Sequence, residues 1–184
     1  MEVMKLSNEY ILPDVLRSGL KLIVCGSAVG DKSAKANSYY AGYNNMFWKI
    51  LCETKLTDCL LKSKDYHNLL NSDIGLTDLA KKTAGVDAKI LYKAYDADLL
   101  IQKINIYKPK VLCFNGKAPA TVFYGYLNKK KLTTVKVNYG EQPCIPLCGE
   151  TIFFIAPSTS GAARRYWKPS YWFELAKLVN DTQI

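Results

Sequence analysis

Short apolar runs alternate along the chain with segments whose apolar residues have helical spacing. The runs, each ending near glycine, proline or a polar turn, are Leu20–Cys25, Ile74–Leu79, Val111–Asn115 and Thr151–Ala156. Apolar runs this short, bounded by turn residues, are typical of strands that are buried on both faces. Their alternation with helical segments predicts an α/β fold with three layers, α/β/α, in which helices cover both faces of a parallel sheet.

The helical segments place their apolar residues on one face. Phe47, Ile50 and Leu51 share a face of one helix, which Asn44 or Asn45 can cap. The last helix has apolar residues at i, i+3, i+4 and i+7, after a capping serine at position 170; these are Trp172, Leu175, Ala176 and Val179.

Residues 124–148, which include the basic run Lys129-Lys130-Lys131, break this alternation. They predict an irregular or hairpin-like excursion from the sheet. No internal repeat or linker divides the chain, so we expect a single domain over residues 1–184.

The composition favours a polyanionic partner. The formal net charge is +9, from 25 Lys and Arg against 16 Asp and Glu. Nucleic acid is the first candidate for so basic a domain, and a basic protein without such a partner is the alternative. No stretch approaches the roughly 18–20 apolar residues of a membrane span, and the N-terminus lacks the apolar region of a secretory signal. We expect an intracellular protein (cytoplasm or nucleoid, or nucleus in a eukaryote) with no membrane partner.

The cysteines and the one histidine do not indicate a metal or redox site. No CxxC pair occurs among the six cysteines, at positions 25, 52, 59, 113, 144 and 148. Iron–sulfur clusters need four cysteines at tighter intervals. We expect reduced, structural thiols, no metal and no cofactor. His67 lies in a polar stretch and is expected at a surface loop or helix edge.

Functional residues are expected where the predicted strands end, because ligands of such sheets bind beyond the carboxyl ends of the strands. The segments that follow the four runs are Gly26–Asn45, Thr77–Lys82, Asn115–Ala118 and Pro157–Arg165.

The first of these segments has the residues of a pocket for a flat polar ligand. Glycines at 26 and 30 permit a close approach by a ligand. Their spacing is neither GxGxxG nor that of a P-loop, so a plain strand-to-loop turn remains the alternative. Tyr39 and Tyr40 can stack on a base or pack in the core.

The last segment, Pro157–Arg165, is suited to a phosphate backbone. Its small hydroxyl residues and glycine let a loop approach closely, and Arg164 and Arg165 add positive charge. The alternative is a capped helix start with both arginines in solvent. Ser158-Thr159-Ser160 is not a GxSxG motif and no matching histidine follows, which excludes a serine hydrolase.

Five segments, in order and within residues 20–168, together resemble the uracil-DNA glycosylase superfamily. They are CGSAVG, SYYAGYNNMFWKIL, DIGLTDLAKK, KPKVLCFNGKAPA and FFIAPSTSGAARR. The likeness is closest to the mismatch-specific uracil/thymine branch and to the hypoxanthine-DNA glycosylase-like branch. It implies a central four-stranded parallel sheet flanked by helices. It also implies an enzyme that flips a damaged base out of DNA and hydrolyses its N-glycosidic bond.

The resemblance also implies roles for single residues. The base pocket would comprise Gly26, Ser27, Ala28, Val29, Gly30, Tyr40 and Asp78. Ala28 stands where relatives keep the Asn or carboxylate that positions the attacking water, so Asn45 of the N-x-F-W segment is assigned that catalytic role. Tyr40 would stack on the base. Asp78 would read the base edge by accepting an N–H, with a cap on the following segment as the alternative.

By the same resemblance, the last segment would be a DNA-intercalation loop. Its DNA-binding residues would be Ser158, Thr159, Ser160, Gly161, Arg164 and Arg165. Many relatives have a histidine in this loop that stabilises the departing base, whereas this chain has Ala156-Pro157-Ser158.

We therefore expect a monomeric, monofunctional DNA glycosylase for base-excision repair. It would act on DNA with a deaminated or mismatched base, uracil or hypoxanthine first, and leave an abasic site. A DNA-binding or damage-sensing module with little catalysis is one alternative, because the usual asparagine and histidine are both missing. An N-glycosidase of free nucleosides or nucleotides is another.

Overall fold

One sheet forms the centre of the molecule in a computed structural model that describes residues 9–181. Residues 1–8 and 182–184 of the predicted domain lie outside the described residues. The strand order is β2-β1-β3-β5-β4. The bounds are β1 (Leu22–Val29), β2 (Ile74–Ala84), β3 (Val111–Asn115), β4 (Gly140–Glu141) and β5 (Ile152–Ala156). Strands β1, β2, β3 and β5 are parallel, and they correspond to the four predicted apolar runs. Strand β1 begins two residues later than its run and β5 one residue later.

The two-residue strand β4 is an addition to the predicted sheet. It pairs antiparallel with β5 and comes from the segment expected to be an excursion. The rest of that segment consists of the end of a helix, two short 3₁₀ helices and connecting turns. The excursion therefore ends by covering the outer edge of β5.

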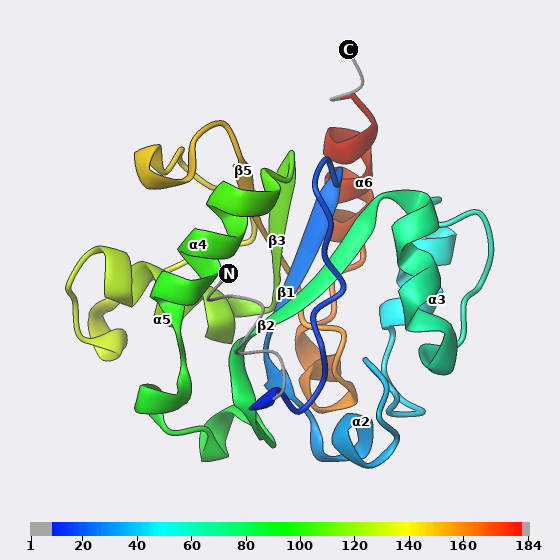
Figure 1. Cartoon of the computed structure of the whole chain (residues 1–184), viewed down its shortest axis with the longest axis horizontal. Helices are drawn as coiled ribbons and strands as arrows, with labels where there is room; N and C mark the ends of the chain where they lie inside the picture. The colour runs from blue at the N-terminus through cyan, green and yellow to red at the C-terminus, as the bar shows by residue number, and fades with distance from the viewer. Residues whose placement is uncertain (1–8, 182–184) are drawn as a thin grey trace.

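Helices cover both faces of the sheet, as predicted. Their bounds are α2 (Asp31–Lys35), α3 (Phe47–Glu53), α4 (Ala97–Tyr107), α5 (Lys117–Leu127) and α6 (Ser170–Asp181). Helices α4 and α5 lie on one face, and α3 and α6 lie on the other (Figure 1). No helix in the described part of the chain is long and apolar enough to cross a membrane.

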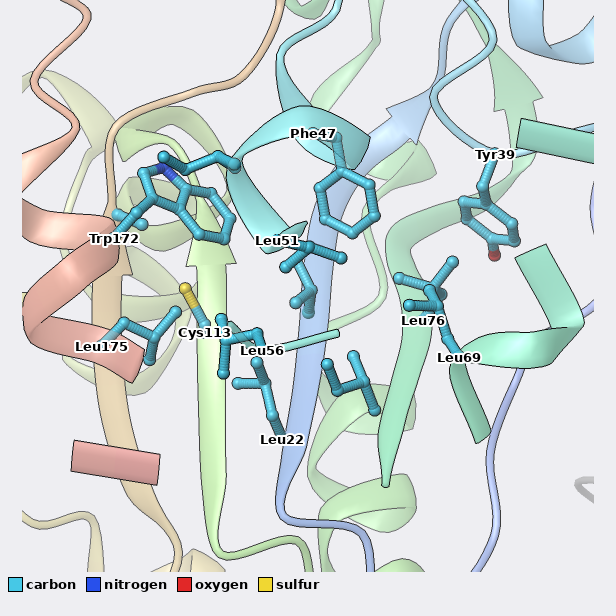
Figure 2. Packing of buried hydrophobic residues seen from close by; sticks show 14 of the residues in the cluster. Leu22, Tyr39, Phe47, Leu51, Leu56, Leu69, Leu76, Cys113, Trp172 and Leu175 are labelled. Carbon is cyan, nitrogen blue, oxygen red and sulfur yellow. The ribbon is translucent and has the colours of Figure 1, made fainter. Parts of the chain in front are cut away.

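Alternate strand positions contribute to two separate cores, because successive strand residues point to opposite faces. Leu22 and Val24 of β1 belong to the core under α3 and α6, whereas Ile23 and Cys25 belong to the core under α4 and α5. Figure 2 shows the first core, where Phe47 and Leu51 of α3 and Trp172 of α6 approach the same strands. Burial on both faces explains why the strands read as continuous apolar runs.

Strands β1 and β2 are longer than predicted, and this changes the setting of the site. The ladder between them continues through the pairs Gly26↔Asp78 and Ala28↔Ala80 before a bulge at Val29. Gly26 to Val29 are therefore strand residues rather than a loop. Asp78 lies inside β2, as in the predicted run Ile74–Leu79, and this excludes the alternative that it caps a following segment.

The segment before β1 pairs with the outer edge of β2. Val15 and Leu76 exchange two backbone hydrogen bonds of 2.9 Å, and the Ile11 amide donates to the Lys81 carbonyl at 2.9 Å. Edge strands of a sheet carry unpaired backbone groups. This segment satisfies several of them and also brings Asp14 beside the sheet.

Trp172 connects α6 to the segment that follows β5. Its side chain is fully buried, and its indole Nε1 donates to the Pro157 carbonyl at 3.0 Å. The helix therefore fixes the backbone where the last predicted functional segment begins.

We predict that Trp172→Phe lowers the free energy of unfolding by about 1–3 kcal/mol, because the buried Pro157 carbonyl loses its donor. Urea denaturation followed by circular dichroism measures this. Phe173, the next residue, is 51% exposed, and Phe173→Leu is expected to change stability by less than about 0.5 kcal/mol. Equal effects of the two changes would contradict this account of α6.

Candidate active site

A cleft of about 430 Å³ opens at the carboxyl ends of β1, β2 and β3. In Figure 1, α2 and the orange segment after β5 lie at this same end of the molecule. The predicted site residues that line the cleft are Gly26, Ser27, Ala28, Val29, Gly30, Tyr40, Asn45, Asp78, Ser158, Thr159 and Ser160. These residues come from three of the four predicted segments, and the fourth, Asn115–Ala118, also lines the cleft. His67 is exposed, as expected, and does not line the cleft.

The strand alternation points several of these residues to the same side of the sheet. Gly26 and Ala28 continue the face of β1 that packs under α3, and Asp78 continues the same face of β2 after Leu76. Asn115 does so for β3 after Cys113. On this face of the sheet, the residues of each strand are apolar under α3 and become small or polar toward the carboxyl end, where they line the cleft.

Gly26 leaves the space that Asp78 occupies. A Cβ at Gly26 would lie 2.5 Å from Asp78 Oδ1, closer than any real contact. The two residues are direct partners in the ladder. The glycine is required here by the close approach of a side chain of the protein, in addition to any approach by a ligand.

Asp78 is a buried carboxylate with unused hydrogen-bonding capacity. Its Oδ2 is out of contact with solvent and has no hydrogen-bond partner among the described residues. Burial raises the pKa of Asp78, and the ammonium group of Lys81, 3.8 Å from Oδ2, acts in the opposite direction. Buried acceptors without a hydrogen bond are costly and rare. This oxygen is therefore a candidate to accept a hydrogen bond from a ligand.

Tyr40 and Tyr39, adjacent in sequence, have different surroundings. Tyr39 is a core residue, 2% exposed. Tyr40 has a left-handed backbone, with φ of 52°, and its ring stacks on Phe47 with centroids 3.8 Å apart. One face of the Tyr40 ring is thereby covered. Burial, followed by the Asp78 carboxylate, raises the pKa of the Tyr40 hydroxyl well above its ordinary value, so this group stays protonated.

Asn45 is held by a short turn at the start of α3. Its side-chain Oδ1 accepts the backbone amide hydrogen of Phe47 at 3.0 Å. Its backbone amide donates to the Gly42 carbonyl at 2.8 Å. Met46, rather than Asn44 or Asn45, occupies the N-cap position. The turn orients the side chain, and the oxygen keeps a second lone pair for another donor.

Asn115 is a cleft residue to which the sequence assigned no individual role, although it begins one of the segments where functional residues were expected. Its side chain makes two hydrogen bonds of 2.9 Å with Thr159, to the hydroxyl and from the backbone amide. The Thr159 carbonyl in turn accepts the Met46 amide hydrogen at 2.9 Å. Asn115 thus connects β3, the loop after β5 and the start of α3. The sequence feature that could have identified it is a polar residue at the end of a buried apolar run, here Val111–Asn115.

The loop after β5 also contacts the segment before α3 directly. A Cβ at Gly161 would lie 2.7 Å from the Asn44 Cβ. Ser160 caps the 3₁₀ helix Gly161–Tyr166 by accepting the Ala162 amide hydrogen at 3.3 Å. This is the alternative considered for these serines, and it does not prevent the hydroxyl from facing a ligand.

The rim of the cleft is basic. Arg164 and Arg165 are exposed on the 3₁₀ helix and do not line the cleft, and Lys117 does line it. Three cations at this end lie over tyrosine rings at 4.6–4.7 Å: Lys32 over Tyr43, Lys117 over Tyr139 and Arg165 over Tyr166. Tyr43 and Tyr166 are exposed and Tyr139 is partly buried. Cations beside accessible aromatic rings suit a strand that presents both phosphates and bases.

The described residues contain no cluster of three or more His, Cys, Asp or Glu side chains arranged to hold a metal ion. The cleft instead offers hydrogen-bonding groups, an aromatic ring and a basic rim. These features can bind a flat polar group that is attached to an anionic backbone.

Comparison with known proteins gives the family and the fold. The family model of the uracil DNA glycosylase superfamily matches residues 13–180. A solution NMR structure of a Methanosarcina acetivorans protein, provisionally assigned as a uracil DNA glycosylase, is similar with a TM-score of 0.59 and 22% sequence identity. The alignment covers 92% of this chain and 96% of that one. At this identity the likeness supports the predicted fold alone.

The steric relation between Gly26 and Asp78 is testable with two glycine variants. We predict that Gly26→Ala lowers the free energy of unfolding by about 1–3 kcal/mol, because the methyl group forces Asp78 or the strand to move. Gly30 has no atom within 4 Å of an added Cβ and φ of −69°. Gly30→Ala should therefore change stability by less than about 0.5 kcal/mol in urea denaturation. Similar losses for both variants would contradict the steric argument.

Proposed function

The chain belongs to the uracil DNA glycosylase superfamily, and on this premise we propose that it excises a deaminated base, uracil or hypoxanthine, from DNA. One observation carries the proposal. The fixed side-chain amide of Asn45 and the buried carboxylate of Asp78, whose Oδ2 has no hydrogen-bond partner among the described residues, line the same cleft. The first can hold a water, and the second can bind the edge of a base.

The proposed reaction hydrolyses the N-glycosidic bond and leaves an abasic site. The base is flipped into the cleft, where Tyr40 stacks on it and Asp78 accepts a ring N–H. Asn45 Oδ1 accepts a hydrogen bond from water through its remaining lone pair and aims that water at the sugar carbon. As the bond to the base loosens, the base departs as an anion. The water oxygen bonds to the sugar carbon, and the proton that it releases neutralises the base anion. Positioning supplies much of the rate in such a step.

Ala28 supports a preference for good leaving groups. It lines the cleft but has no polar atom to assist the water, and Ala156-Pro157-Ser158 has no histidine to stabilise the departing base. The protein must then rely on the leaving ability of the base itself. Two bases are suitable substrates in this respect: hypoxanthine, and uracil that is mispaired with guanine.

The catalytic role of Asn45 is tested with duplex oligonucleotides that carry uracil, hypoxanthine, xanthine or a G·T mismatch. We predict abasic-site formation by the wild-type protein and a rate about 10²- to 10³-fold lower for Asn45→Ala. Asn45→Asp keeps the oxygen that accepts from Phe47 and should retain more activity than Asn45→Ala. Asn68, exposed on the 3₁₀ helix Ser63–Ser72, provides the control variant Asn68→Ala, with unchanged activity.

Other outcomes of the panel favour other functions. Binding to damaged duplexes without cleavage of any substrate would favour a damage-sensing module. Release of bases from free nucleosides, with no preference for DNA, would favour a nucleoside hydrolase.

The contribution of the basic rim is measured by the salt dependence of DNA binding. Each lost phosphate contact lowers the slope of log K against log salt by about 0.9. We predict that Arg164→Gln with Arg165→Gln reduces the slope by about 1.8. Lys177 is exposed on α6, and Lys177→Gln should leave the slope unchanged. Equal slopes for all three proteins would place the DNA elsewhere.

A further inference from the structure

A cluster of buried charges lies at the edge of β2, directly beside the cleft. The side chains of Lys81 and Lys103 are 3% and 2% exposed. Asp14 lies between them: its Oδ1 is 3.0 Å from Lys81 Nζ, and its Oδ2 is 2.6 Å from Lys103 Nζ. Thr77 donates to Asp14 Oδ1 at 2.7 Å and accepts from Lys103 at 3.2 Å. Two ammonium groups thus share one carboxylate.

Asp78 is the second carboxylate of the cluster and balances its charge. Lys81 Nζ lies 3.8 Å from Asp78 Oδ2, within range of an ion pair but too far for a hydrogen bond. Lys81 donates a hydrogen bond to the Tyr39 hydroxyl, 2.8 Å away, and forms its closer ion pair with Asp14. Lys81 therefore lies near Asp78 as a compensating charge, while Oδ2 accepts no hydrogen bond from the described residues.

Asp78 has titratable neighbours on β1, on β2, on α4, in the segment before α3 and in the segment before β1. They are Cys25, Lys81, Lys103, Tyr39, Tyr40 and Asp14. Burial raises the pKa of Cys25, Tyr39 and Tyr40 well above neutrality, so these three stay uncharged. The charged neighbours are Asp14 and the two lysines. The pKa of Asp78 is raised overall, with burial as the largest cause and Asp14 adding to it. Of the charged neighbours, Lys81 has the largest effect, and it lowers the pKa.

The charge of Asp78 decides which base edges it can match. An ionised carboxylate only accepts hydrogen bonds, whereas a protonated one has both a donor and an acceptor. Uracil and hypoxanthine present a ring N–H. Cytosine and adenine present a ring nitrogen lone pair beside an amino group, an edge that a protonated carboxyl complements and a carboxylate repels.

We propose that Lys81 is a positioning residue that keeps Asp78 ionised, so that the site selects bases with a ring N–H and rejects undamaged cytosine and adenine. This inference rests on the proposed function, since it assumes that a base occupies the cleft. Lys81 also keeps the pair neutral, which limits the repulsion between the carboxylate and a base that leaves as an anion. Its ammonium group acts through Asp78 and does not line the cleft.

The first test measures the charge of Asp78 without any substrate. Carbon-13 NMR of the aspartate carboxyl groups, assigned with Asp78→Asn, follows Asp78 through a pH titration. In Lys81→Met, Asp78 should lose its proton about 1–3 pH units higher than in the wild type. Lys103→Met removes an equally buried ammonium that does not contact Asp78, and should cause a smaller shift. Should Lys81→Met fail to fold, Lys81→Gln removes the charge but retains an N–H donor.

The second test measures base selection. In Lys81→Met, the preference for uracil over cytosine should appear only at higher pH than in the wild type, by the shift that NMR records for Asp78, because a protonated Asp78 can pair with either base. Discrimination between uracil and cytosine should fall at neutral pH. Lys81→Arg, which keeps the charge, should restore the wild-type profile. The exposed neighbour Lys82, paired with Glu9, gives the control Lys82→Met, with no change.

The two tests separate the inference from the function on which it rests. An unshifted Asp78 titration in Lys81→Met, or an Asp78 that is already protonated at neutral pH in the wild type, overturns the role of Lys81 even if the protein is active. An unchanged pH profile together with a shifted titration overturns the role in selection. Failure of the wild type on every DNA substrate refutes the proposed function, and the titration still decides whether Lys81 sets the charge of Asp78.

Discussion

Charged side chains that are buried away from water must be paired with opposite charges. The structure at the edge of β2 and around Asp78 depends on this constraint. Two buried ammonium groups are stable there only because Asp14 and Asp78 are beside them. Asp14 belongs to the segment that pairs with the outer edge of β2. The start of the described chain is therefore tied to the charge balance of the site, although Asp14 itself does not line the cleft.

The other polar side chains of the cleft are also held in fixed positions by their neighbours. Asp78 and Asn115 lie on strands, where packing on both faces limits their movement, and Gly26 provides the space for the first of them. Asn45 is on a turn, but its orientation is set by the Phe47 amide. Groups held in this way have little freedom to reorganise during a reaction, which is the usual requirement for electrostatic stabilisation of a transition state.

The fold was predictable from the sequence because burial on both faces produces apolar runs that length and turn residues delimit. The extent of β1 and β2 was not, because the residues that lengthen them, Gly26–Val29 and Ala80–Ala84, include glycine, small and charged residues that break the apolar pattern. Lys81 and Lys82 illustrate the limit best. They are adjacent and identical, yet one is buried and the other exposed. The difference depends on Asp14, which is remote in sequence.

The hydrogen bonds between Asn115, Thr159 and Met46 have a consequence for the energetics of docking. They order the loop after β5 in the free protein, so that DNA does not have to order it on arrival. Ordering a flexible loop costs conformational entropy, and a preorganised surface avoids that cost. Discrimination between normal and damaged DNA would then lie in the ease with which a base leaves the stack, and much less in closure of the protein around it.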